Sequence, residues 1–112
     1  MILRWVLGTL ACLLVLVGVM GFTQTGGRGA TSAAPAYNVF HLVFGLAGLA
    51  LARWGSPAAM RSFLVGFGLL DLYQAIASHQ HWFPESFFRW THTDDVLHVV
   101  IGLVLVVVGA LL

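Results

Sequence analysis

Two short patterns, each a polar residue followed by a histidine, interrupt apolar stretches of the chain. Asn38 precedes His41 by three positions, and Asp95 precedes His98 by the same spacing. A side-chain oxygen at a helix start accepts hydrogen bonds from free backbone N–H groups, and negative charge there suits the helix dipole. We therefore expect Asn38 and Asp95 to cap two helices. The two histidines, one turn further along, should hydrogen-bond to neighbouring helices.

Asp71 is the other residue that could do chemistry, because it interrupts the apolar run 58–77. A carboxylate inside a membrane helix is costly and usually faces the bundle interior. Its candidate partners are His41, His98, Gln74 or a proton. We expect a structural polar cluster in the outer half of the bundle, made of Asn38, His41, Asp71, Gln74, Asp95 and His98. The alternative is a functional site at Asp71, which would make the chain a small proton- or ion-linked carrier.

The histidines also allow two cofactor hypotheses. His41 and His98 could ligate a tetrapyrrole, since Gly45 and Gly102 follow them by four positions and leave flat space beside each ring. A divalent metal could be held near the outer surface by a looser set: His79, His81, His92, Asp94 and Asp95. The main expectation contains neither a cofactor nor a metal. No residues stand at catalytic spacing, so an enzyme is not expected.

Composition indicates the setting in which these residues work. Of the 112 residues, 60% are hydrophobic and 8% are charged, and the mean hydropathy is +0.96. Soluble domains carry roughly 25% charged residues. A spanning helix needs about 20 mainly apolar residues. Four such stretches predict a single integral membrane domain, an all-α bundle of four transmembrane helices at about 2–22, 37–54, 57–78 and 95–112. A cleaved signal peptide is the alternative for the first stretch, whose length favours a retained span.

The segments between these stretches read as linkers. Gly55, Ser56 and Pro57 predict a tight helical hairpin, with Ser56 as N-cap and Pro57 in the first turn. The aromatic segment 79–95 is expected to lie in the headgroup layer, anchored by Trp82, Phe83, Phe87, Phe88 and Trp90. The arginines favour cytoplasmic termini, because Arg4, Arg53 and Arg61 fall on one side and Arg28 and Arg89 on the other. A net charge of +1 argues against nucleic-acid binding.

The repeated pattern predicts an internal duplication. Asn38 and Asp95 are 57 positions apart, and the same offset relates His41 to His98 and Arg4 to Arg61. The halves 1–55 and 58–112 would each be a two-helix hairpin, and the two would be related by a pseudo-twofold axis along the membrane normal. Polar and small residues at helical spacing mark the inner faces: Asn38, His41, Gly45, Gly48 and Ala52; Asp95, His98, Gly102, Leu105 and Gly109; Leu64, Gly68, Asp71, Ala75 and Ser78.

The pattern Asn38-x-x-His41-Leu42 with Gly45-Leu46 and Arg53, followed by Asp95-x-x-His98 and Gly102, resembles a bacterial family of small four-helix membrane proteins. That family is a domain of unknown function. The resemblance covers most of the chain and is most specific in the second and fourth helices. It implies a multi-pass protein of the bacterial inner membrane and supplies no activity.

The chain is small and has almost no segment outside the helices, so it has few ways of acting alone. We therefore expect a non-enzymatic structural or accessory subunit of a larger respiratory or photosynthetic membrane complex. Its partners would be the lipid bilayer and other membrane subunits, without nucleic acid or a soluble substrate.

Overall fold

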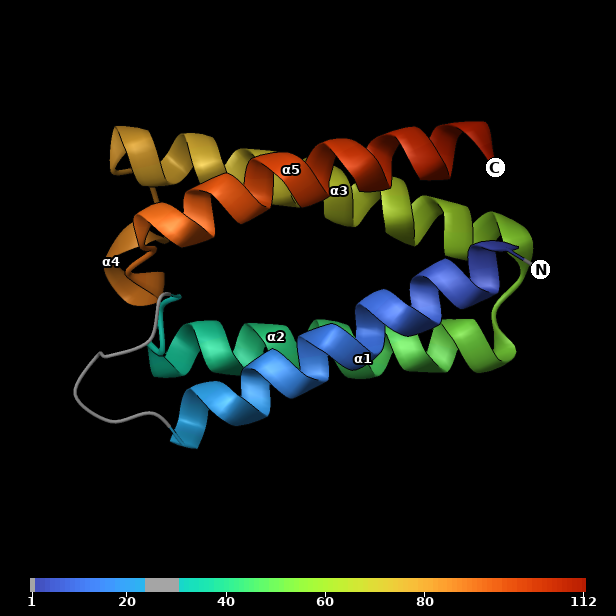
Figure 1. Ribbon diagram of the computed structural model, residues 1–112, viewed down its shortest axis with the longest axis horizontal. Coiled ribbons are helices and arrows are strands. Elements are labelled where there is room, and N and C mark those ends of the chain that lie inside the picture. The colour runs from blue at the N-terminus through green and yellow to red at the C-terminus, as the bar shows by residue number, and fades with distance from the viewer. Residues whose placement is uncertain (1, 24–30) are drawn as a thin grey trace.

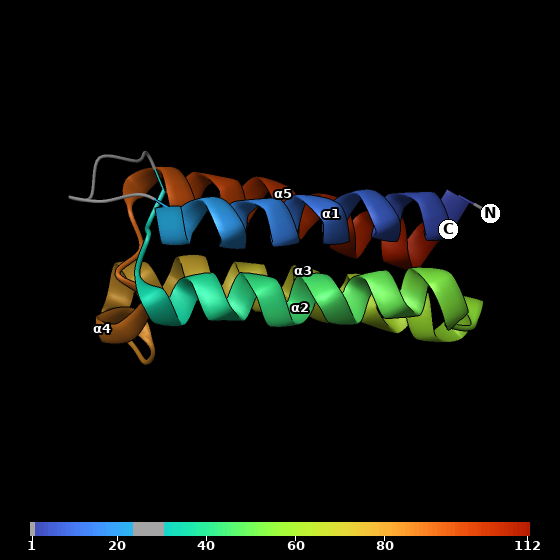
Figure 2. The same cartoon turned by 90° about the horizontal axis from the view of Figure 1, so that it is seen from below.

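A computed structural model describes residues 2–23 and 31–112, and their regular structure is entirely helical. The long helices are α1 (Ile2–Thr23), α2 (Pro35–Trp54), α3 (Pro57–Gln80) and α5 (His92–Leu111), and the one-turn α4 (Glu85–Phe88) stands between the last two (Figure 1). Two layers form, one containing α1 and α5 and the other α2 and α3 (Figure 2). Two boundaries correct the sequence expectation: α2 starts two residues earlier than predicted and α5 three residues earlier.

The turn between α2 and α3 has the chemistry expected of it. The Ser56 hydroxyl accepts a hydrogen bond from the Ala59 amide at 3.1 Å, and Pro57 occupies the first turn of α3. A Cβ atom at Gly55 would lie 2.5 Å from the Leu51 carbonyl oxygen, so only glycine fits where the chain leaves α2. This hairpin places α2 and α3 in the same layer (Figure 2).

Close packing within each half uses glycines, as the spacing of small residues predicts. A Cβ atom at Gly45 would lie 2.9 Å from the Val15 amide nitrogen of α1. A Cβ atom at Gly102 would lie 2.8 Å from the Gly68 carbonyl oxygen of α3. The α1–α2 and α3–α5 backbones therefore approach more closely than a side chain at either glycine would allow.

The contacts of the two halves correspond at an offset of 57 positions. Both bounds of α2 and α5 differ by that offset. Arg4 donates hydrogen bonds to carbonyl oxygens at the end of α2, including that of Gly55, and Arg61 donates to the Leu112 carbonyl at the end of α5. Gly45 packs against the Ala11 carbonyl oxygen, and Gly102 packs against the Gly68 carbonyl oxygen. The two glycines are 57 positions apart, and so are the two carbonyl groups.

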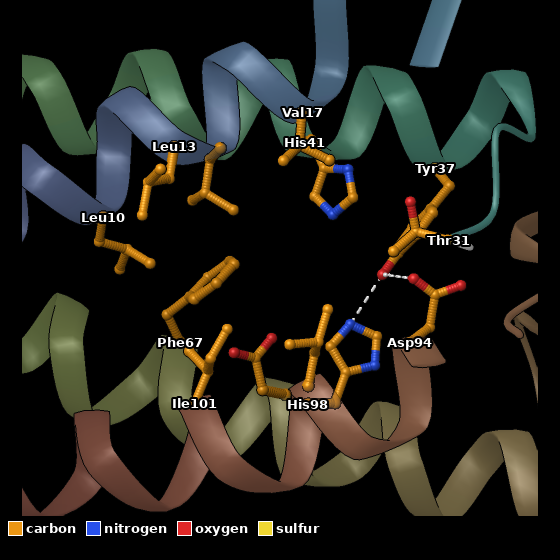
Figure 3. A pocket seen from close by; sticks show the side chains of 13 residues that line it. Leu10, Leu13, Val17, Thr31, Tyr37, His41, Phe67, Asp94, His98 and Ile101 are labelled. Atoms are coloured by element: carbon orange, nitrogen blue, oxygen red, sulfur yellow. Dashed lines mark hydrogen bonds between the residues drawn. The ribbon is translucent and has the colours of Figure 1, made fainter. Parts of the chain in front are cut away.

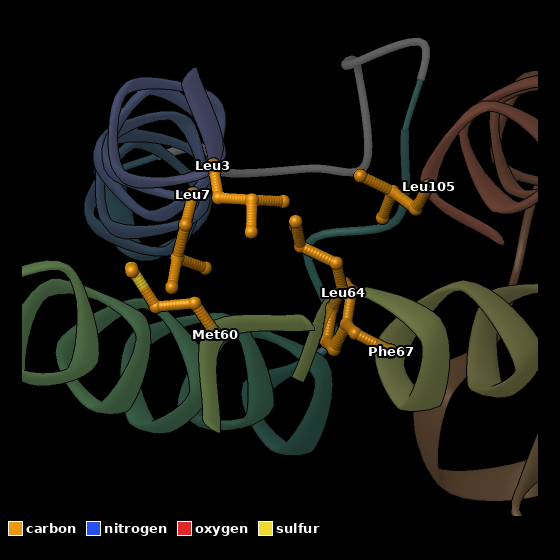
Figure 4. Packing of buried hydrophobic residues seen from close by; sticks show 6 residues of the cluster. All are labelled: Leu3, Leu7, Met60, Leu64, Phe67 and Leu105. Carbon is orange, nitrogen blue, oxygen red and sulfur yellow. The ribbon is translucent and has the colours of Figure 1, made fainter. Parts of the chain in front are cut away.

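The two halves meet through different contacts at their two ends. Near the chain termini, α1, α3 and α5 share an apolar core of Leu3, Leu7, Met60, Leu64, Phe67 and Leu105 (Figure 4). At the opposite end a second cluster contains Ala34, Tyr37, Ala77 and Trp90. Towards that second end, α1 and α5 diverge (Figure 1).

The surface of the bundle is unusually apolar. Three helices, α1, α2 and α5, are long and apolar enough to cross a membrane, and the less apolar α3 is not one of them. Large apolar side chains on the outside include Leu46 and Leu103, which are 59% and 53% exposed. Both ends of the chain and the α2–α3 turn lie at one end of the bundle, and α4 lies at the other (Figure 1).

Candidate functional site

A cavity of about 210 Å³ lies between the two halves, towards the end of the bundle that carries α4. All four long helices contribute to its wall, which is mainly apolar with a few polar groups (Figure 3). Thr31 lines it from the segment before α2. The wall residues on the helices are Leu10, Leu13, Leu14, Val17, Tyr37, His41, Phe67, Asp71, Asp94, Leu97, His98 and Ile101.

Both predicted histidines line this cavity and face each other from α2 and α5 (Figure 3). Their side chains are almost fully buried, His41 at 7% and His98 at 6% exposure. Nε2 of His98 lies 2.8 Å from the Tyr37 hydroxyl, which lies 3.4 Å from Oδ1 of Asp94. This chain of contacts connects the first half to the second. The Nδ1 atoms of both histidines are buried and have no hydrogen-bond partner among the described residues.

His41 differs from His98 because its ring lacks the hydrogen bond that His98 forms with Tyr37. Its ring projects into the cavity (Figure 3) and packs against Tyr37, with ring centroids 4.1 Å apart. Among the described residues, the His41 ring makes no hydrogen bond to a neighbouring helix, contrary to the expectation from the sequence. A buried polar group without a partner costs roughly 1–3 kcal/mol. His41 is thus the polar side chain of the cavity that is most available to a ligand.

The acid that ties the helix ends together is Asp94, not Asp95. Asp94 Oδ2 accepts hydrogen bonds from the backbone amides of Ser32 and Thr91, each at 2.8 Å. Thr91 is the N-cap of α5 and forms a capping box with Asp94. Asp94 therefore closes the start of α5 and holds the segment before α2 against it.

The prediction that Asn38 and Asp95 cap helices is wrong. Because α2 and α5 begin earlier than expected, both residues stand in the second turn, away from the free N–H groups. Ala34 is the N-cap of α2 and makes no side-chain cap hydrogen bond. Asn38 instead donates to the Ala33 carbonyl at 3.0 Å, and its side chain fills the space above Gly21. Neither Asn38 nor Asp95 lines the cavity.

Asp71 lines the cavity and is held from one side by a hydrogen-bond chain. Gln74 donates to Oδ1 of Asp71 at 3.2 Å, and the Trp90 indole donates to Gln74 at 3.1 Å. Asp71 is 3% exposed and Gln74 is 2% exposed. Of the six predicted cluster residues, His41, Asp71 and His98 thus share the cavity, and Gln74 orients Asp71.

Sequence reasoning missed Tyr37, Asp94 and Trp90 as members of this site. Trp90 was assigned to the headgroup layer, but it is 8% exposed and its indole faces Gln74. The neighbouring Trp82, Phe83 and Phe87 are exposed, at 50%, 75% and 59%. One signal could have found Asp94: Thr91 followed three positions later by an acid is a capping-box pattern.

The geometry favours neither cofactor hypothesis. An apolar cavity of roughly 150 Å³ accommodates benzene, so about 210 Å³ is space for one substituted ring and not for the four rings of a tetrapyrrole. Nε2 of His98 is also taken by Tyr37. No group of three or more metal-ligating side chains occurs within residues 2–23 and 31–112, so the looser histidine–aspartate set does not form a metal site there.

Comparisons of the chain with known protein families, with curated proteins and with solved structures find no match. The resemblance carried by the Asn38 and Asp95 patterns therefore remains a prediction.

Proposed function

We propose that this chain is a four-span integral membrane protein that acts as a non-enzymatic accessory subunit of a larger membrane complex. One observation carries the membrane assignment: the distribution of side chains is the reverse of that in a soluble protein. Asn38, Asp71 and Gln74 are buried, whereas leucines and valines cover the outside. Apolar side chains on the outside are stable in contact with lipid, whereas polar groups must find hydrogen-bond partners inside the bundle.

The fourth span is α3, despite its lower hydropathy. It has 24 residues, which corresponds to about 36 Å at 1.5 Å per residue and exceeds the roughly 30 Å of a hydrocarbon core. It packs along α5, with Gly102 against Gly68 and Gly109 against Val65. A helix packed against a spanning neighbour over this distance must cross with it. The polar side chains Asp71 and Gln74 that lower its hydropathy point inward.

A duplicated hairpin with a pseudo-twofold axis along the membrane normal accounts for the corresponding contacts. Helix bounds, glycine contacts and arginine hydrogen bonds recur 57 positions apart in the two halves. Unpaired Nδ1 atoms on His41 and His98 recur in the same way. Since each half has an even number of spans, the halves share one orientation in the membrane.

We place both termini in the cytoplasm of a bacterial inner membrane, because Arg4 and Arg61 hold helix ends on the side of the termini. Single cysteines at Ser56 and Ser86, in a background where Cys12 is replaced by serine, test this topology. We expect a membrane-impermeant maleimide to label position 86 from outside and position 56, which is exposed in the α2–α3 turn, only after lysis. Labelling of position 56 in intact cells would invert the topology.

The accessory role rests on how little of the chain lies outside the helices. Within residues 35–112 the segments between helices are short: 55–56, 81–84 and 89–91. Native gel electrophoresis of digitonin extracts, with an epitope-tagged chain, tests the role. We expect the tag to migrate in a complex much larger than the 12.1 kDa chain. Migration as a monomer or a homodimer alone would contradict it.

A further inference from the structure

We propose that the cavity between the two halves binds the head group of a lipid-soluble quinone. The inference goes beyond the accessory role, because it concerns the isolated chain. It starts from the position of the opening. Rim residues from α1 and α5 are exposed on the outside of the bundle: Leu13 at 53%, Val17 at 37% and Leu97 at 40%. We infer from these exposed rim residues that the cavity opens between α1 and α5, two apolar helices that diverge at this end (Figure 1) and whose outer faces would contact the membrane.

The size and shape of the cavity indicate one ring with a tail. About 210 Å³ exceeds the roughly 150 Å³ that accommodates benzene. The flat side chains of Tyr37, His41 and Phe67 form part of the wall. Aromatic side chains pack well against a planar ring. An apolar tail on that ring could leave through the opening between α1 and α5 without crossing a polar layer.

Polar groups from both halves face this space. His41 belongs to the first half, is 7% exposed and projects into the cavity (Figure 3). Asp71 belongs to the second half, is 3% exposed and lines the same cavity. In an apolar surrounding, each polar group gains from a ligand atom with which it can form a hydrogen bond. The two carbonyl oxygens of a quinone only accept hydrogen bonds, so they match this pair when His41 presents a ring N–H and Asp71 carries a proton. A hydrocarbon chain offers no such acceptors.

The counterpart of Asp71 in the first half indicates that the helices can pack without an acid at this position. The cavity wall contains four pairs of residues 57 positions apart: Leu10 and Phe67, Leu14 and Asp71, Tyr37 and Asp94, and His41 and His98. Leu14 occupies in the first half the place that Asp71 occupies in the second, so a leucine fits the shape of this packing, although at position 71 it would leave the Gln74 amide without its acceptor. The acid is costly inside a membrane, and besides its contact with Gln74 it lines the cavity, where a ligand can reach it.

The test is a binding titration of the purified chain in dodecyl maltoside micelles with decylubiquinone as the probe. Trp90 is a suitable fluorescence reporter, because its ring centroid lies 6.3 Å from that of His98. Trp5, Trp54 and Trp82 are exposed and can be replaced by phenylalanine in the background. We expect saturable quenching with a stoichiometry of one quinone per chain.

Two pairs of variants decide whether the quenching reports this cavity. His41→Leu should raise the Kd roughly tenfold by removing a hydrogen-bonding group. The matched control His79→Leu changes an exposed histidine outside the cavity and should leave the Kd unchanged. Leu14→Phe should abolish saturation by filling the cavity, whereas Leu46→Phe on the outer face should not.

The outcomes separate quinone binding from partition into micelles. Quenching that does not saturate, or that is equal in Leu14→Phe and Leu46→Phe, would overturn the proposal. Relief of the quenching by decylbenzene at concentrations similar to that of the bound decylubiquinone would also overturn it, because the site would then recognise only an apolar tail. If circular dichroism shows that His41→Leu does not fold, His41→Gln takes its place. The glutamine amide can still form a hydrogen bond, so we expect a Kd within about threefold of that of the parent chain. Because the isolated chain is used, failure here is distinct from failure to find a partner complex.

Discussion

Replacement of Gly102 by alanine tests whether the close approach of α3 and α5 is essential. A Cβ atom there would lie 2.8 Å from the Gly68 carbonyl oxygen and 3.0 Å from Leu72 Cγ. A leucine side chain can rotate, but the carbonyl oxygen belongs to the helix backbone and cannot move alone. The two helices must therefore separate along the contact. Gly66 is the matched control, because it is an exposed glycine of α3 with no atom within 4 Å of an added Cβ.

The expected magnitude follows from the difference between the two variants. Each replacement of a helical glycine by alanine gains about 0.5–1 kcal/mol of helix propensity. Overpacking a tight contact costs about 1–3 kcal/mol. Gly66→Ala should therefore raise the free energy of unfolding slightly. Because the propensity gain is common to both, Gly102→Ala should lie about 1–3 kcal/mol below Gly66→Ala.

Unfolding by sodium dodecyl sulfate in mixed micelles, followed by far-ultraviolet circular dichroism, measures this difference. Gly45→Ala should lose a comparable amount, since its added Cβ would lie 2.9 Å from a backbone nitrogen of α1. Equal stability of Gly102→Ala and Gly66→Ala would refute the argument that backbone contact limits this position. Loss at Gly102 without loss at Gly45 would refute the equivalence of the two halves.

Three further substitutions test the polar contacts, each by the same unfolding measurement. Tyr37→Phe removes the hydroxyl between His98 and Asp94 and should lower the free energy of unfolding by about 1–3 kcal/mol. The control Tyr73→Phe removes an exposed hydrogen bond to a backbone carbonyl and should lower it by less. Equal losses of stability in the two variants would contradict the importance of burial. Thr91→Ala removes the N-cap of α5 and should cost about 0.5–2 kcal/mol, and an unchanged midpoint would show that the capping box is dispensable. Asp71→Leu leaves the Gln74 amide without its acceptor and should destabilise the fold, while Asp71→Asn keeps an acceptor and should not. Equal stability of these two variants would argue against a structural role of Asp71. Loss of a transport activity in a folded Asp71→Asn protein would favour the carrier alternative.

Local sequence patterns predicted the helices and their inner faces well. Pro57 and Ser56 act within one turn of the chain, so their effect on the start of α3 needs no tertiary information. Gly45 and Gly102 lie on buried faces as their spacing indicated, because residues three and four apart share one side of any helix. The apolar composition likewise indicated an inverted distribution of polar and apolar residues before any contact was known.

The partners of the polar residues could be decided only by the tertiary structure. Neighbouring positions on a helix point about 100° apart, so Asp94 and Asp95 face different surroundings although they are adjacent. An error of three residues in the start of α5 was therefore enough to assign the cap to Asp95. The contact of Tyr37 with His98 joins residues 61 positions apart, and it depends on how the two halves cross and diverge. The sequence by itself determined an apolar helical chain with glycine-lined faces, because those properties are local or compositional. Only the packing of one half against the other determined the cavity, because its wall is assembled from four helices whose relative placement no single segment encodes.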